Sequence, residues 1–125
     1  MNFSSDKRLP LKLRFLIVDD NRQMREMTRS YLTDLASEIR ECCDGIVALA
    51  AYEEFRPDWV LMDWEMKEMD GIDATRKILK SFPDAKILLV TQYDDLELRR
   101  EASEAGAVGF VSKDDLIRLR SMVQK

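Results

Sequence analysis

The feature that most constrains the fold of this chain is a repeated alternation of short apolar segments with longer amphipathic ones. The apolar segments are rich in Val, Ile and Leu and are bounded by polar or turn-forming residues, which is typical of strands buried on both faces. The sequence predicts strands over residues 13–18, 38–42, 58–62, 86–90 and 108–111.

The segments between these strands place apolar residues three or four positions apart, which predicts helices. The expected helices cover residues 21–36, 47–55, 72–82 and 94–105, and a last one runs from Asp114 onward. Regular alternation of strand and helix predicts an α/β fold, a doubly wound five-stranded parallel sheet with helices on both faces. We expect residues 13–125 to form this one domain and residues 1–12 to form a polar tail.

Composition excludes several classes of protein. Apolar residues make up 46% of the 125-residue chain and charged residues 35%, which is ordinary for a globular domain. No apolar run approaches the ~20 residues of a membrane span, and the N-terminus lacks a secretory signal, so we expect a cytoplasmic protein. A net charge of −4 without a long basic run argues against direct nucleic-acid binding. The adjacent Cys42 and Cys43 match neither a zinc pair nor a structural disulfide, and reduced thiols are expected.

The chain contains no histidine. This excludes Ser-His and Cys-His nucleophiles, His-based zinc sites and a phosphohistidine carrier. Any chemistry must therefore use carboxylates, hydroxyls and lysine, with or without a metal ion.

Polar side chains follow four of the five predicted strands. Asp19 and Asp20 follow the first strand, Asp63 the third, Thr91 the fourth and Lys113 the fifth. Taken singly, each has an ordinary reading as a helix cap, a strand residue or a surface lysine. The carboxyl ends of parallel strands meet at one edge, however, where such sheets bind ligands. Clustered carboxylates need a cation, and an all-oxygen site favours Mg2+, beside which a carboxylate can act as a nucleophile toward phosphorus.

Four motifs in this order resemble the receiver domains of two-component response regulators. They are FLIVDDN at residues 15–21, DWEMKEMDG at 63–71, Thr91, and GFVSK at 109–113. The first two are most similar to chemotaxis-type single-domain receivers. The last, followed by Asp114, is more similar to receivers attached to helix-turn-helix output domains. The resemblance covers nearly the whole chain from Leu13 and implies the flavodoxin-like strand order 2-1-3-4-5.

The resemblance also implies a role for each matching residue at the metal site. Asp63 would be the phosphoacceptor and one of the groups around Mg2+. Asp20 would bind Mg2+ directly, Asp19 largely through water, and the backbone carbonyl of Glu65 would be a further ligand.

The remaining implied roles concern phosphoryl transfer and switching. Lys113 would pair with the phosphoryl group, Thr91 would be drawn toward it, and Phe110 would swing inward. The donor would be a phosphohistidine of a sensor histidine kinase or a phosphotransfer protein. The protein would catalyse only its own phosphorylation and dephosphorylation. It would act on a downstream protein target or on a C-terminal output domain outside this chain. A homodimer through the last helices is a further option, and no contact with a membrane is expected.

Two alternatives remain open from the sequence. One is a magnesium-dependent phosphohydrolase, although Asp63-Trp64-Glu65 imitates its Asp-x-Asp pair poorly. The other is a degenerate receiver that serves only as an interaction module. Four arginines near the last helices form either a partner-contact face or a solvated surface: Arg99, Arg100, Arg118 and Arg120. Because Asp114 replaces the proline that often follows the lysine, we expect a trans Lys113–Asp114 bond.

Overall fold

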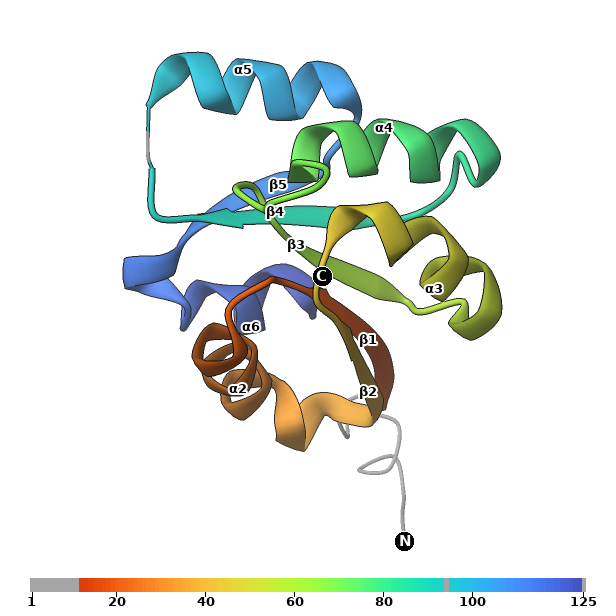
Figure 1. Ribbon diagram of the computed structural model, residues 1–125. Coiled ribbons are helices and arrows are strands. Elements are labelled where there is room, and N and C mark those ends of the chain that lie inside the picture. Colours follow the sequence, from red (N-terminus) through yellow and green to blue (C-terminus); the bar gives the residue numbers. More distant parts are fainter. Residues whose placement is uncertain (1–11, 94, 125) are drawn as a thin grey trace, which may run out of the picture.

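A computed structural model describes residues 12–93 and 95–124, and one parallel sheet of five strands forms its centre (Figure 1). The strands are β1 (Leu13–Val18), β2 (Ala36–Cys42), β3 (Trp59–Asp63), β4 (Ile87–Thr91) and β5 (Gly109–Ser112). Their order is β2-β1-β3-β4-β5, with every neighbouring pair parallel. The expected fold class and strand order are confirmed.

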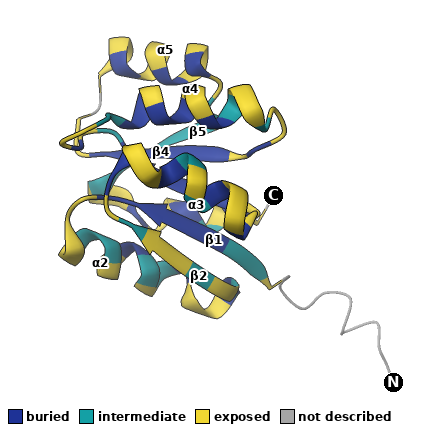
Figure 2. Ribbon diagram, turned by 45° about the vertical axis from the view of Figure 1, so that its right-hand side comes forward, coloured by how far each residue is buried: buried dark blue, intermediate teal, exposed yellow. Residues whose placement is uncertain are grey.

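The helices cover both faces of the sheet, as Figures 1 and 2 show. They are α2 (Arg22–Leu32), α3 (Ala48–Phe55), α4 (Gly71–Ser81), α5 (Leu96–Ala105) and α6 (Arg118–Val123). Buried residues of α3, α4 and α5 share one apolar core, and those of α2 and α6 share the other. Among the described residues, none of these helices has the length and apolar character needed to cross a lipid bilayer.

The central strands supply both cores because successive side chains point to opposite faces. In β3, Val60 and Met62 enter the core under α3, α4 and α5, whereas Trp59 and Leu61 enter the core above α2 and α6. All five residues of this strand are buried, which explains its continuous apolar sequence up to Asp63.

Side-chain caps begin α2 and α4, the helices that follow β1 and β3 at the carboxyl edge of the sheet or in the loop after it. The side chain of Asn21 accepts from the Met24 amide at 3.0 Å and begins α2. Asp70 accepts from the Asp73 amide at 2.9 Å and begins α4. These caps satisfy amides that lack partners at a helix N-terminus, and they fix where α2 and α4 begin.

Two predicted helix boundaries were wrong by four residues each. The helix expected over residues 21–36 ends at Leu32, a 3-10 turn follows over Thr33–Leu35, and β2 begins at Ala36 instead of residue 38. Leu35 is buried by that turn, so the apolar spacing continues although the helix does not. The last helix was expected from Asp114, but a 3-10 turn (Lys113–Asp115) precedes α6.

Two sequence expectations lie outside the described residues. Of the predicted polar tail, only Lys12 belongs to the described residues. Asp94, where the fourth helix was expected to begin, also lies outside them. In the described part, α5 begins at Leu96 after the cap Asp95, whose side chain accepts from the Leu98 amide at 2.7 Å.

Candidate functional site

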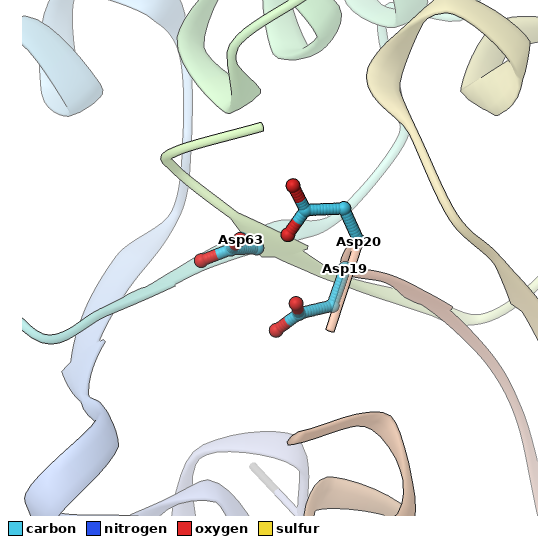
Figure 3. Close-up of side chains that lie close together, drawn as sticks. All are labelled: Asp19, Asp20 and Asp63. Carbon is cyan, nitrogen blue, oxygen red and sulfur yellow. The ribbon is translucent and has the colours of Figure 1, made fainter. Parts of the chain in front are cut away.

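Three carboxylates gather at the carboxyl edge of the sheet. Val18 pairs with Met62 in the register of β1 and β3, so the residues that follow these strands are neighbours. One carboxylate oxygen from each of Asp19, Asp20 and Asp63 lies within 4.8 Å of the others (Figure 3). Asp19 and Asp63 are each only 4% exposed, whereas Asp20 is open to solvent.

Lys113 reaches the same cluster from the turn that follows β5. Its Nζ lies 2.9 Å from Oδ1 of Asp63 and 3.4 Å from Oδ2 of Asp19. Burial lowers the pKa of Lys113, but its hydrogen bond to Asp63 and the nearby charges of Asp63 and Asp19 outweigh burial and raise the pKa. The lysine therefore stays protonated in the site.

The acidic cluster is not neutralised by this single lysine. Burial is the main reason why the pKa of Asp63 is raised to about 6, and the charges of Asp19 and Asp20 add to it, while Lys113 opposes the shift. Three carboxylates against one ammonium leave an excess of negative charge on oxygen ligands only. A hard divalent cation such as Mg2+ fits this donor set.

A cleft of about 510 Å³ opens above the cluster. It is lined by Asp20, Asn21, Met24, Met27, Asp63, Glu65, Thr91, Gln92, Tyr93, Lys113 and Asp114. Glu65 thus lies at the cleft, two residues after the end of β3. The cleft has room for a phosphoryl group beside the carboxylates.

Thr91 and Phe110 lie in two different places. Thr91 is 1% exposed and lines the cleft, and its Oγ1 accepts from the Tyr93 amide at 3.1 Å, which leaves its own proton free to be donated. Phe110 is half-buried in a separate groove of about 140 Å³ between α5 and β5, where the guanidinium of Arg99 stands 5.4 Å from the centre of its ring. The expected site residues therefore meet at one edge, except that Phe110 occupies the neighbouring groove.

The loop that follows Asp63 is fastened at several points. The Gly71 amide donates to the Trp64 carbonyl at 2.7 Å. The buried Asp44 accepts from the amides of Ile46 at 2.8 Å and Glu68 at 3.0 Å, which joins this loop to the end of β2.

Trp64, at the start of this loop, and Gly71, the first residue of α4, also make close contacts at the edge of the sheet. A Cβ atom at Gly71 would lie 2.1 Å from the Asp63 carbonyl oxygen, so only glycine fits there. The ring of Trp64 meets that of Tyr93 edge-on at 5.6 Å between centroids. The start of α4 therefore packs directly against the backbone of Asp63.

The roles of Asp44 and Arg25 were not predicted from the sequence. The contact of Asp44 with the Glu68 amide joins residues far apart in the chain and has no local sequence signal. Arg25 was not singled out, yet its Nη1 donates to the Asp19 carbonyl at 2.7 Å. The available signal was a cation within the first turns of the helix that follows an acidic pair.

Two other expectations concern the C-terminal part of the chain. The Lys113–Asp114 peptide bond is trans, as predicted. Arg120 is neither simply solvated nor free for a partner, because its guanidinium donates to both Asp34 oxygens, at 2.6 and 2.9 Å, and to the Tyr31 carbonyl at 2.9 Å. It fastens α6 to the end of α2.

Comparison with known proteins finds close relatives over most of the chain. The family described as "Response regulator receiver domain" matches residues 15–124. The uncharacterized transcriptional regulatory protein YhcZ of Bacillus subtilis is 36% identical over 116 residues, which are 88% of this chain and 54% of that protein. The chemotaxis protein CheY of Thermotoga maritima is 41% identical over 101 residues, which are 80% of this chain and 84% of that protein. The chain spans about half the length of two transcriptional regulatory proteins of Bacillus subtilis that it matches.

Solved structures of receiver domains and response regulators also superpose on most of the chain. A LuxR-family two-component response regulator from Aurantimonas sp. superposes with a TM-score of 0.80 at 29% identity, over 90% of this chain and 85% of that one. The receiver domain of the histidine kinase CKI1 from Arabidopsis thaliana, complexed with Mg2+ and BeF3−, superposes with a TM-score of 0.75 at 31% identity, over 95% and 94% of the two chains.

Proposed function

The chain belongs to the response regulator receiver domain family of two-component systems, and on that premise we propose that Asp63 accepts a phosphoryl group from a phosphohistidine. The donor is a sensor histidine kinase or a phosphotransfer protein. The observation that carries the proposal is the meeting of three carboxylates with Lys113 at the carboxyl edge, within a cleft large enough for the group.

The transfer follows from the geometry of Asp63. One carboxylate oxygen attacks phosphorus, a P–O bond forms, the P–N bond to the donor imidazole breaks, and the product is an acyl phosphate. Lys113, whose Nζ already lies 2.9 Å from Oδ1 of Asp63, stays charged and pairs with the incoming phosphoryl oxygens.

The acidic cluster supports a role for Mg2+. Asp19, Asp20 and Asp63, with the Glu65 carbonyl, would hold the ion, and the CKI1 receiver that this chain resembles was solved with Mg2+. Bound Mg2+ would neutralise negative charge on the phosphoryl oxygens, which is most of what phosphoryl transfer requires.

Switching would be shared among several residues. Moving a population from 1:99 to 99:1 needs about 5.5 kcal/mol, whereas one hydrogen bond to a charged group supplies about 1.5–3 kcal/mol. Thr91 alone is therefore insufficient. We assign the remainder to Lys113 and to repacking of Phe110, which lies two residues before the end of β5 and pairs with Leu89 of β4.

The output of the switch is a partner surface or an attached domain. The chain matches about half of two transcriptional regulatory proteins but most of a chemotaxis protein, and a receiver would serve in either arrangement. Its net charge of −4 agrees with a protein target and not with direct nucleic-acid binding.

The test is phosphorylation with a small acyl phosphate. Acetyl phosphate and Mg2+ should add one phosphoryl group per chain, measured by intact-protein mass spectrometry, and EDTA should prevent it. Asp63→Asn should remove the labelling, whereas Asp84→Asn, which changes charge equally at an exposed position, should retain it. Labelling of Asp63→Asn, or no labelling of the wild type, would contradict the proposal. Repeated turnover of phosphomonoesters would instead indicate a phosphohydrolase.

A further inference from the structure

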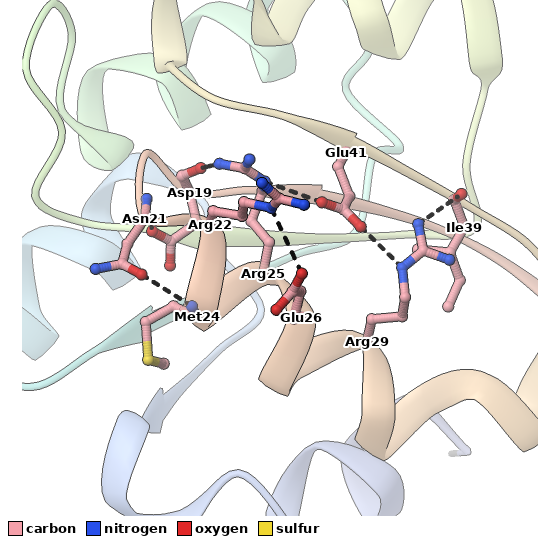
Figure 4. A network of polar contacts seen from close by, with 9 residues as sticks. All are labelled: Asp19, Asn21, Arg22, Met24, Arg25, Glu26, Arg29, Ile39 and Glu41. Atoms are coloured by element: carbon pink, nitrogen blue, oxygen red, sulfur yellow. Dashed lines mark hydrogen bonds and ion pairs between the residues drawn. The ribbon is translucent and has the colours of Figure 1, made fainter.

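Arg25 connects the acidic pair to the edge of the sheet. It lies in α2, and its side chain is only 17% exposed. Its Nη1 donates to the Asp19 carbonyl at 2.7 Å, and its Nε donates to Oε1 of Glu41 at 2.9 Å (Figure 4). One guanidinium therefore joins the backbone between Asp19 and Asp20 to a carboxylate of β2.

Glu41 is itself held in place. It lies beside Ile17 in the register of β1 and β2, and its Oε2 accepts from Nε of Arg29 at 2.8 Å. Burial raises the pKa of Glu41, but hydrogen bonds from Arg29 and Arg25 outweigh burial and lower it. Glu41 is thus an ionised, doubly bonded anchor for Arg25.

The backbone of Asp19 is restrained on both sides of the residue. Its amide donates to the Cys42 carbonyl at 3.1 Å, and its carbonyl accepts from Arg25. The Asn21 amide also donates to Oδ1 of Asp19 at 2.8 Å. These bonds keep the turn in place although its two carboxylates and that of Asp63 repel one another.

We propose that Arg25 is a positioning residue for the cation site, which it preorganises by holding the Asp19 carbonyl, and that Glu41 acts through Arg25. The inference rests on the proposed magnesium site. Groups that orient metal ligands typically change metal affinity by about 10- to 100-fold when they are removed. Because Arg25 holds a backbone carbonyl, we expect a loss of about tenfold.

The sign of the effect separates positioning from simple charge. Arg25 is a cation near a cation site, so by Coulomb's law its removal should tighten Mg2+ binding. Positioning requires the opposite, because the turn loosens when the guanidinium is lost. A weakened affinity is therefore not explained by charge.

Glu41 needs a double variant, because loss of its negative charge would also weaken Mg2+ binding. If Glu41 acts through Arg25, Glu41→Gln weakens binding in the wild type but has no further effect when Arg25→Gln is already present. If Glu41 acts by charge, its loss is the same in both backgrounds.

The experiment measures the affinity for Mg2+ alone, by calorimetry and by Trp64 fluorescence, on protein whose circular dichroism is native. Arg25→Gln should bind about tenfold more weakly, and Arg25→Lys should recover part of the loss because its amine still reaches one acceptor. The matched control is Arg22→Gln, which removes the same charge from the same helix at a side chain that is 83% exposed. It should not weaken binding. If Arg25→Gln does not fold, Glu41→Gln alone and with Arg25→Lys carries the test.

Unchanged or tighter Mg2+ binding by Arg25→Gln, or an equal effect of Glu41→Gln in both backgrounds, would overturn the inference and leave the proposed function intact. A wild-type protein that does not bind Mg2+, or one that binds it equally well after Asp63→Asn, would overturn the proposed function instead.

Discussion

Replacing Asp63 by Asn should stabilise the metal-free protein. Burial and the neighbouring carboxylates raise the pKa of Asp63 from 3.8 to about 6, so at neutral pH folding keeps a carboxylate ionised in an unfavourable place. A shift of roughly two pKa units corresponds to about 3 kcal/mol at 1.36 kcal/mol per unit. Because Asp63 borders the open cleft, water screens part of this, and we expect a gain of about 1–3 kcal/mol at pH 7.

The pH dependence follows from the direction of the shift. The folded pKa lies above the unfolded one, so the wild type has its full stability below the unfolded pKa and loses it as pH rises through about 6. Asn does not titrate, so the difference between variant and wild type should grow over that range. At pH 4.5 the difference should be less than about half of its value at pH 7.

Urea unfolding in EDTA at the two pH values measures this difference, with Asp84→Asn as the control for net charge. Saturating Mg2+ should reduce the difference in stability between Asp63→Asn and the wild type, because the ion stabilises only the wild-type site. If Asp63→Asn is no more stable than the wild type at pH 7 in EDTA, or if the gain is the same at pH 4.5, the electrostatic reasoning is wrong.

Three further predictions concern the same edge of the sheet. Affinity for Mg2+ should fall about tenfold per pH unit below about 6, because a proton then competes for Asp63, and calorimetry at pH 5 and 7 checks this; equal affinities would contradict it. Gly71→Ala should destabilise the protein by roughly 1–3 kcal/mol, because its Cβ would lie 2.1 Å from the Asp63 carbonyl oxygen. Urea unfolding measures this loss, and a variant as stable as the wild type would show that the backbone moves apart without cost. Tyr93→Ala should shorten the lifetime of the acyl phosphate, because Tyr93 lines the cleft and its ring is held edge-on against that of Trp64. Mass spectrometry after removal of the donor measures this lifetime, and an unchanged lifetime would exclude shielding by Tyr93.

The alternation of apolar and amphipathic segments was sufficient to predict the sheet and its two helical layers, because strands buried on both faces must be apolar throughout. It failed between Leu32 and Leu35, since a helix followed by a 3-10 turn buries both residues at the spacing of a continuous helix. The spacing of apolar residues therefore does not show where the helix ends, because a continuous helix and a helix followed by a 3-10 turn bury the same side chains.

The edge rule for parallel sheets was enough to bring Asp19, Asp63 and Lys113 together from distant parts of the sequence. The contacts of Arg25 and Asp44 with main-chain groups could not be predicted in this way. They depend on the reach of one side chain across a specific strand register, and a carbonyl or amide partner leaves no signature in the sequence.

The central position of β3 has a mechanical consequence for signalling. Its side chains alternate between the two apolar cores, so the strand cannot shift along its axis without disturbing both layers of helices. A displacement at its carboxyl end, as phosphorylation of Asp63 would produce, should therefore be felt by the helices on both faces of the sheet.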